Sequence, residues 1–279
     1  MTRSLTLMKT LFAVAVFLAV LVLTPIALSP VLFKNLQTND QLQAPPQRML
    51  VVFAHTDDEV TNSGLIRHFA SLGTEIVLLT LTDGSANPKS DLNACQPDEN
   101  ITQCRIREVN ASAEILGVKH VETPLLPDSA LMEHLPQAVV NVSRLVNSFQ
   151  PDAILTMEPS GLNGLADHQA AFLAVAGALK TLSQTPTLYL SKLPWPFSWF
   201  LKSKIPARFE KNTIVFPTDD TLLETKVAAA LKHKSQASTI QGLTLGLGPR
   251  GLFRWINFET YSVHPTDDLT LLAGTYQFP

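Results

Sequence analysis

The segment Met49–Glu59, MLVVFAHTDDE, runs from apolar residues directly into a histidine and three carboxylates. Charged side chains at a strand end cost little when solvated, but acids packed this closely repel one another unless a cation or a proton-transfer task holds them together. His55, Asp57, Asp58 and Glu59 are therefore the first candidates for chemistry. The alternative is a solvated helix N-terminus, where the macrodipole favours acids and the histidine only caps or packs.

A second motif, Asp167-His168, follows more than a hundred residues later. Two imidazoles and one carboxylate, from His55, Asp58 and His168, are the donor set of a catalytic zinc or similar divalent site with open coordination positions. Asp57 then remains available to take a proton from metal-activated water. The second motif favours a metal site over the solvated helix terminus.

The elements that carry these motifs alternate along the chain. Apolar runs predict strands over residues 49–55, 75–83, 120–126, 152–159, 185–193 and 212–216, and helical spacing predicts helices over 60–72, 105–117, 135–149, 167–182 and 221–239. We expect an α/β fold with a Rossmann-like, mostly parallel sheet and helices on both faces. Because ligands of such sheets bind beyond the carboxyl ends of the strands, both motifs should lie on one rim.

An uncharged run precedes this domain. Residues 11–33 are long enough for a membrane-spanning helix, which needs about 20 residues. Arg3 and Lys9 before it predict a single-pass anchor with an extracytoplasmic (periplasmic or extracellular) domain, although the cytosolic face stays open. A cleaved signal peptide is the alternative. The predicted division is an anchor over 1–33, a linker over 34–48 and a domain over 49–279, with the membrane as a partner.

Charge and composition exclude some classes of protein. The net charge of −3 provides no basic face for nucleic acid. No Gly-x-Gly-x-x-Gly follows the first strand, which argues against a nucleotide-binding protein, and we interpret the glycine-rich residues 242–255 as a loop. Cys95 and Cys104 form a disulfide in an oxidising compartment or remain free thiols. They lie in a polar stretch, residues 84–104, that we expect to cover the site as a lid.

Taken in order, short motifs of this sequence resemble those of the PIG-L or LmbE-like deacetylases, metal-dependent hydrolases that remove acetyl from N-acetylglucosamine-type amines. The similar stretches are Ala54–Glu59 (Ala-His-Pro-Asp-Asp-Glu in the family), Thr82–Gly84 (Thr-Asp-Gly), Arg105–Val118 (an Arg-x-x-Glu helix ending Leu-Gly-Val), Pro127–Asp128, Gly164–His168 (Gly-His-x-Asp-His) and Lys226 with His233–Gln236 (His-x-Ser-Gln). The resemblance covers roughly residues 49–262.

The resemblance implies a role for each matching residue. His55, Asp58 and His168 would bind Zn²⁺ or another divalent metal, and Asp57 would be the general base. The implied reaction removes acetyl from an N-acetylated amino sugar conjugate, lipid-linked or part of an envelope glycan. Arg105 and Asp128 would contact the sugar or its acyl group. The loop or the base would be supported, without contact to the metal, by Glu59, Asp167 and His233.

Leu165 departs from the family pattern, which places a histidine there. Leucine cannot stabilise an oxyanion or protonate an amine, and loss of one such donor costs on the order of 10²-fold to 10³-fold in rate. Three readings stay open. Asp57 returns its proton to the amine, His264 fills the space, or the chain is a catalytically impaired protein that binds metal and sugar. Thr56, in place of the family's proline, removes no functional atom.

Overall fold

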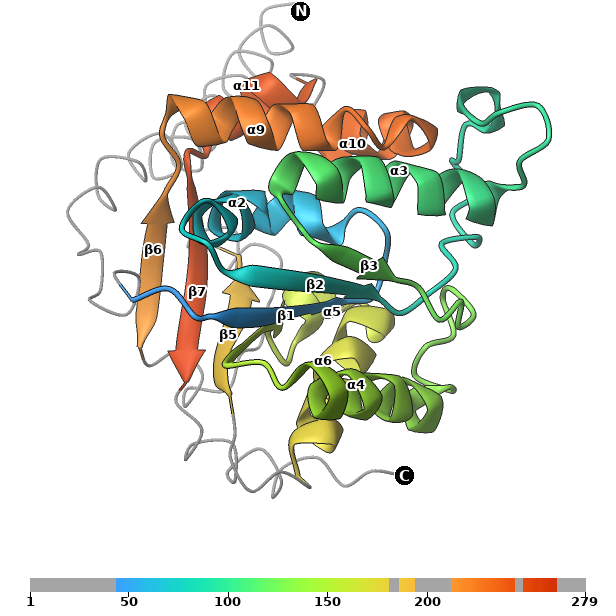
Figure 1. Cartoon of the computed structure of the whole chain (residues 1–279). Helices are drawn as coiled ribbons and strands as arrows, with labels where there is room; N and C mark the ends of the chain where they lie inside the picture. Colours follow the sequence, from blue (N-terminus) through green and yellow to red (C-terminus); the bar gives the residue numbers. More distant parts are fainter. Residues whose placement is uncertain (1–43, 181–185, 194–211, 244–247, 265–279) are drawn as a thin grey trace, which may run out of the picture.

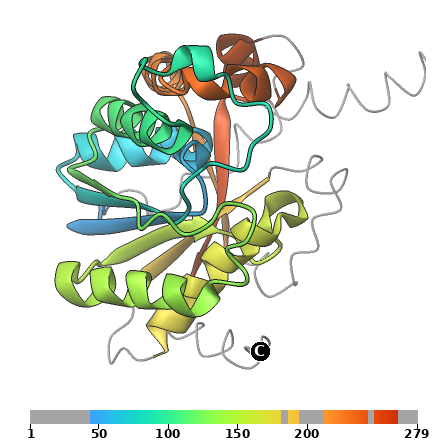
Figure 2. The same ribbon diagram turned by 90° about the vertical axis from the view of Figure 1, so that its right-hand side faces the viewer.

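The computed structural model describes residues 44–180, 186–193, 212–243 and 248–264, and within them the chain forms a seven-stranded sheet between two layers of helices (Figures 1 and 2). The strand order is β3-β2-β1-β4-β5-β7-β6. The strands are β1 (Arg48–Phe53), β2 (Glu75–Thr80), β3 (His120–Glu122), β4 (Ala153–Met157), β5 (Thr187–Lys192), β6 (Thr213–Pro217) and β7 (Phe258–His264).

The central strand β1 explains why its sequence is apolar without alternation. It pairs in parallel with β2, from Arg48 opposite Glu75 to Phe53 opposite Thr80, and on its other side with β4. Met49, Val51 and Phe53 pack into the core on one face of the sheet. Leu50 and Val52 pack into the core on the opposite face. Both faces are buried, so residues 49–53 of the strand are all apolar, and the carboxyl ends of β1, β2 and β4 meet at one edge.

The helices divide between the two faces as Figure 1 shows. On one face lie α2 (Ser63–Ser71), α3 (Ile101–Leu116) and α9 (Asp220–Ala230), followed along the chain by α10 (Ala237–Leu243) and α11 (Gly248–Trp255). The other face is covered by α4 (Leu135–Phe149) and α6 (Ala166–Leu179), with the short α5 (Gly161–Gly164) before α6. Three 3-10 turns complete the description: η2 (Asp58–Asn62), η3 (Leu92–Ala94) and η4 (Lys234–Gln236).

The predicted fold class, a mostly parallel sheet preceded by a transmembrane helix, is wrong as stated. The sheet is mixed, because β7 runs antiparallel to both β5 and β6. The sequence FETYSVH hid this strand, since it contains Glu, Thr, Ser and His although all of its positions are buried. In the part of the chain that the structure describes, no helix has the length and apolar character needed to cross a membrane. Residues 1–43, which contain the predicted anchor and most of the linker, lie outside that part.

Two predictions near the C-terminus are also corrected. The single helix predicted over 221–239 is broken, since α9 ends at Ala230 and η4 intervenes before α10. The break lets side chains of the turn 233–236 bond to carboxylates on other elements. The loop predicted over 242–255 contains α11, whose Phe253 packs against Leu223 and Val227 of α9. In both places tertiary contacts override the local pattern.

Candidate active site

The predicted metal ligands converge at the carboxyl edge of the sheet. His55 follows β1, Asp58 begins η2 and His168 lies in the first turn of α6. His168 Nε2 lies 3.2 Å from His55 Nδ1 and 3.2 Å from Asp58 Oδ1, and His55 Nδ1 lies 3.6 Å from Asp58 Oδ2. Ligand atoms about 2.0–2.1 Å from a tetrahedral zinc lie about 3.3 Å apart. The spacing and the donor chemistry therefore fit a divalent ion, and these three residues form a candidate metal site.

A turn after β4 orients His168. The Nδ1 atom of His168 lies 3.2 Å from the carbonyl oxygen of Gly161. His168 Nδ1–H therefore donates to this oxygen, and Nε2 faces the other candidate ligands. The Glu158 carboxylate accepts hydrogen bonds from the backbone N–H groups of Ser160 and Leu162 and fastens the turn. Gly161 has φ +69°, and a Cβ there would come within 3.1 Å of His168 Cβ. Sequence reasoning missed Glu158 and Gly161, although EPSG at the end of a strand was a turn signal.

The opposite side of the His55 ring faces two carboxylates. His55 Nε2 lies 3.4 Å from Asp128 Oδ1 and 3.4 Å from Asp167 Oδ2. The backbone N–H of Ala86 donates to Asp128, and the N–H groups of Ser129 and Leu131 donate to Asp167. The structure thus places Asp128 and Asp167 beside a metal ligand, and with His55 they form a second, overlapping set of possible donors. Their predicted roles toward sugar and base remain predictions.

Burial and neighbouring charges together shift the pKa values of the ionisable groups in the site. Burial alone would lower the pKa of His55, but the carboxylates of Asp128, Asp167 and Asp58 hold that pKa well above its usual value. Burial would raise the pKa of Asp58, yet His168 and His55 hold it far below its usual value. For Asp57, burial and the neighbouring charge of Asp58 both raise the pKa. A carboxylate with a raised pKa is the stronger proton acceptor that a general base requires.

The predicted supporting residues Glu59 and His233 meet in the interior. Glu59 is fully buried and accepts hydrogen bonds from His233 Nε2 and from Ser112 Oγ, both at 2.6 Å. Because Glu59 directly follows Asp58, this contact ties the loop that carries the candidate ligand Asp58 to α3 and to the turn after α9. The geometry agrees with a residue that orients the loop from behind.

Arg105 does not open onto the solvent. Its side chain is 2% exposed, and Nη2 donates to Ser90 Oγ at 2.7 Å. Burial lowers the pKa of its guanidinium, while the carboxylates of Asp57 and Asp128 oppose that effect. The residue predicted to touch the sugar therefore lies beneath the stretch 84–100, near the base, and its role remains a prediction.

The stretch 84–100 is fixed at both ends over the site. Cys95 and Cys104 form a disulfide, which joins the stretch to the first turn of α3 and decides the alternative that the sequence left open. The other end is held by three hydrogen bonds to the turn η4 and to α10. They run from Asp91 N to Ser235 O at 2.8 Å, from Ser238 Oγ to Lys89 O at 2.8 Å, and from Asn87 Nδ2 to Thr239 Oγ1 at 3.1 Å.

Neither Leu165 nor His264 supplies the donor that the family pattern expects. Leu165 caps the N-terminus of α6 and is 46% exposed, three residues before His168. His264 of β7 pairs with Leu188 of β5. Leu188 pairs with Ile154 of β4, and Ile154 pairs with Leu50 of β1, so His264 is level with Leu50 across the sheet. The site follows Phe53, three residues or about 10 Å further along β1. His264 therefore lies toward the opposite end of the sheet and does not replace the missing histidine.

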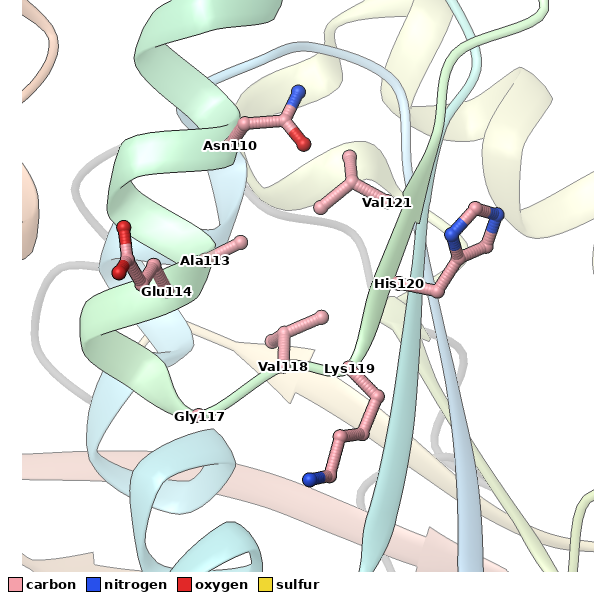
Figure 3. Close-up of a pocket in the computed structure, with 8 residues that line it drawn as sticks. All are labelled: Asn110, Ala113, Glu114, Gly117, Val118, Lys119, His120 and Val121. Atoms are coloured by element: carbon pink, nitrogen blue, oxygen red, sulfur yellow. The ribbon is translucent and has the colours of Figure 1, made fainter.

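A separate cavity of about 460 Å³ lies between the C-terminal half of α3 and the edge strand β3 (Figure 3). The polar side chains of Glu114, Lys119 and His120 point in three different directions there (Figure 3). None of the candidate ligands lines this cavity.

The chain is thus an α/β protein with a candidate metal site of two histidines and one aspartate at the carboxyl edge of its sheet. Residues 50–179 match the family model described as PIG-L, GlcNAc-PI de-N-acetylase. This part of the chain, which holds all three candidate ligands, matches the PIG-L family, and the resemblance seen in the sequence is confirmed.

Curated relatives agree with this assignment. Over 146 residues the chain is 27% identical to a 1D-myo-inositol 2-acetamido-2-deoxy-alpha-D-glucopyranoside deacetylase of Geodermatophilus obscurus, covering 44% of this chain and 50% of the relative. Over 157 residues it is 28% identical to a mycothiol S-conjugate amidase of Streptomyces coelicolor, covering 48% of this chain and 53% of the relative. The chain thus spans about half the length of these relatives.

Solved structures share the fold. Teicoplanin deacetylase Orf2 in its zinc-inhibited form superimposes with a TM-score of 0.60 at 17% identity, over 79% of this chain and 99% of that one. GalB, a 4-carboxy-2-hydroxymuconate hydratase of Pseudomonas putida, superimposes with a TM-score of 0.51 at 17% identity, over 78% and 95%. One fold therefore carries proteins with different named activities, so the chemistry has to be argued from the site.

Proposed function

We propose that the chain is a metal-dependent N-deacetylase that removes the acetyl group from an N-acetylated amino sugar conjugate. The observation that carries this proposal is the convergence of His55, Asp58 and His168 beside the half-buried carboxylate of Asp57. The names of the curated relatives, which act on acetamido sugars or on a mycothiol conjugate, support the substrate class. Zn²⁺ is the proposed ion, since two imidazoles and a carboxylate suit it well.

The residues of the site have distinct tasks in this reaction. When bound, the ion acts as a Lewis acid that polarises the acetamide carbonyl and lowers the pKa of water. His55, Asp58 and His168 hold the ion and fix its position. Asp57 accepts a proton from the attacking water as the new C–O bond forms.

Asp57 also has to return that proton. The C–N bond breaks when the amine nitrogen receives a proton, and the products are acetate and the free amine. Leu165 has no proton to give, and His264 lies toward the opposite end of the sheet. The carboxyl of Asp57, whose pKa burial raises, therefore serves as base and then as acid.

The test is acetate release from a panel of N-acetylglucosamine conjugates by the metal-loaded protein. We expect turnover by the wild type and a loss of at least about 10²-fold in kcat for Asp57→Asn, with bound metal unchanged. His55→Ala and His168→Ala should lose the metal. Full activity of Asp57→Asn would exclude the base, and unchanged metal content in both histidine variants would exclude the ligand assignment.

A catalytically impaired protein that binds metal and sugar is the second candidate, and exposed Leu165 is the observation that favours it. The variant Leu165→His separates the two. If Asp57 performs both proton transfers, the added histidine changes kcat by less than about 10-fold. If the missing donor limits the reaction, kcat rises by on the order of 10²-fold to 10³-fold.

A further inference from the structure

Three residues of the turn 233–236 each bind a different carboxylate. His233 Nε2 pairs with Glu59 at 2.6 Å. The backbone N–H and the hydroxyl of Ser235 donate to Glu108 at 2.8 and 2.6 Å. Gln236 Nε2 donates to Asp57 Oδ2 at 2.5 Å. The turn that breaks the predicted helix is therefore built against the acidic groups behind the site.

The contact with Gln236 is the one that concerns the reacting carboxylate. Asp57 occupies the N-cap position of η2, but its side chain makes no capping hydrogen bond. Among the described residues, its carboxylate accepts one hydrogen bond, and that bond comes from Gln236. An ionised carboxylate can only accept, so the amide nitrogen of Gln236 must face it.

Gln236 is itself rigidly placed. It is 2% exposed, and its backbone N–H donates to the His233 carbonyl. The bonds from Ser235 to Glu108 anchor the turn to α3 on its other side. Gln236 Oε1 is buried without a hydrogen-bond partner among the described residues. The amide nitrogen therefore faces Asp57 at the cost of an unsatisfied amide oxygen.

We propose that Gln236 is a positioning residue, which holds Asp57 through Oδ2 and leaves Oδ1 free to exchange the proton with water and amine. The inference deepens the proposed function and rests on it. An amide suits this task, because it orients the carboxylate without the full positive charge of a lysine or arginine, which would weaken the base. A misplacement of about 1 Å in such a group can cost on the order of 10²-fold in rate.

The direct test is Gln236→Met, which keeps the length of the side chain and removes the donor. We expect kcat for acetate release to fall about 10-fold to 100-fold, with KM and bound metal unchanged. Gln137→Met, on the exposed side of α4, is the matched control and should behave as the wild type. Gln236→Glu is a second variant of the same shape that cannot donate when ionised, and it should also lose kcat.

The result that overturns the proposal is a folded Gln236→Met or Gln236→Glu protein whose kcat stays within about 2-fold of the wild type, far below the loss expected for a displaced base. Loss of metal in both variants would also overturn it, because the residue would then only maintain the fold. If the wild type releases no acetate, that result refutes only the proposed function. Crystal structures of the wild type and of Gln236→Met then still test the positioning role. The Asp57 carboxylate should be turned in Gln236→Met, and an unchanged orientation would refute the positioning role.

Discussion

Both ring nitrogens of His55 have polar neighbours, and these neighbours affect how the site can bind an ion. Its Nδ1 faces His168 and Asp58, whereas its Nε2 lies 3.4 Å from Asp128 and from Asp167. A carboxylate behind a ligating imidazole fixes the ring and makes the other nitrogen a stronger donor to a metal. The same carboxylates make the ring hold its proton more tightly, so proton and metal compete for His55.

This competition predicts that metal binding releases protons. The pKa values of His55 and His168 lie above their usual range, chiefly because the carboxylates around them outweigh burial. Both rings therefore hold a proton more tightly than a free imidazole does, and a ligand must be deprotonated to bind. We expect protons to be released when zinc binds. Calorimetric titration in buffers of different ionisation enthalpy measures this release, and an enthalpy independent of the buffer would contradict it.

Among individual residues, the sequence predicted that the candidate ligands meet, but it did not reveal the residues that support them. His55, Asp58 and His168 were predicted to meet because parallel strands bring their carboxyl ends to one edge. Gln236 and Glu158 were not assigned functions, because their contacts depend on how distant segments are packed. Gln236 and Asp57, for example, are 179 positions apart in the chain.

Among the elements, the turn between β4 and α6 depends on one glycine. Gly161 adopts φ +69°, a conformation that strains other residues, and its carbonyl receives His168 Nδ1–H. An added Cβ would also meet Gln169 N at 3.1 Å and His168 Cβ at 3.1 Å. Strain at this point is therefore transmitted directly to a metal ligand.

The variant Gly161→Ala should weaken metal binding by about 10-fold to 100-fold, because the partner that orients His168 moves. It should also lower the free energy of unfolding by about 1–2 kcal/mol through the left-handed backbone. Gly73→Ala is the matched control. Gly73 has φ +94° with no atom within 4 Å of an added Cβ, so it should show the stability loss alone. Equal metal affinity in both variants, measured by competition with a chelator, would refute the role of the turn.

The helix predicted over 221–239 shows why some elements could not be read from the sequence. Its helical pattern is sound up to Ala230, where α9 ends. Beyond that point the local preference loses to hydrogen bonds with Glu59, Glu108 and Asp57, since bonds to charged groups contribute about 1.5–3 kcal/mol each. The partners lie on other elements, so a local window of sequence does not reveal them.

Across the whole molecule, a buried ion pair joins the antiparallel part of the sheet to the helical layer behind the site. Glu259 of β7 accepts hydrogen bonds from Lys226 Nζ at 2.5 Å and from the N–H groups of Gly64 and Leu65 at 2.8 and 2.9 Å. Lys226 Nζ also donates to the Thr61 carbonyl. The strand that the sequence did not reveal thereby holds the start of α2, directly after the metal-binding loop.

Removing one partner of this pair leaves a charge buried without compensation. Lys226→Met should therefore lower the free energy of unfolding by about 3–5 kcal/mol. Lys232→Met, just after the end of α9 at an exposed position, should change it by less than about 0.5 kcal/mol. Urea unfolding of both variants provides the comparison, and similar midpoints would show that the pair contributes little.

We propose that the domain works in an oxidising compartment, and the Cys95–Cys104 disulfide supports this placement. The bond closes a loop with a sequence separation of 9. For a loop of that size, cross-linking stabilises by about 2–3 kcal/mol. Replacing both cysteines with serine should lower the melting temperature accordingly. Free thiols at both positions in protein taken from its native cells without reductant would contradict the proposal.

The central claim is that one divalent ion is held by residues from two distant turns. Crystals grown with one equivalent of zinc, measured at the zinc absorption edge, test it most directly. The anomalous difference map should contain a single strong peak about 2.0–2.2 Å from His55 Nδ1, the Asp58 carboxylate and His168 Nε2. A peak at His55 Nε2 between Asp128 and Asp167, or no peak at these residues, would contradict the claim.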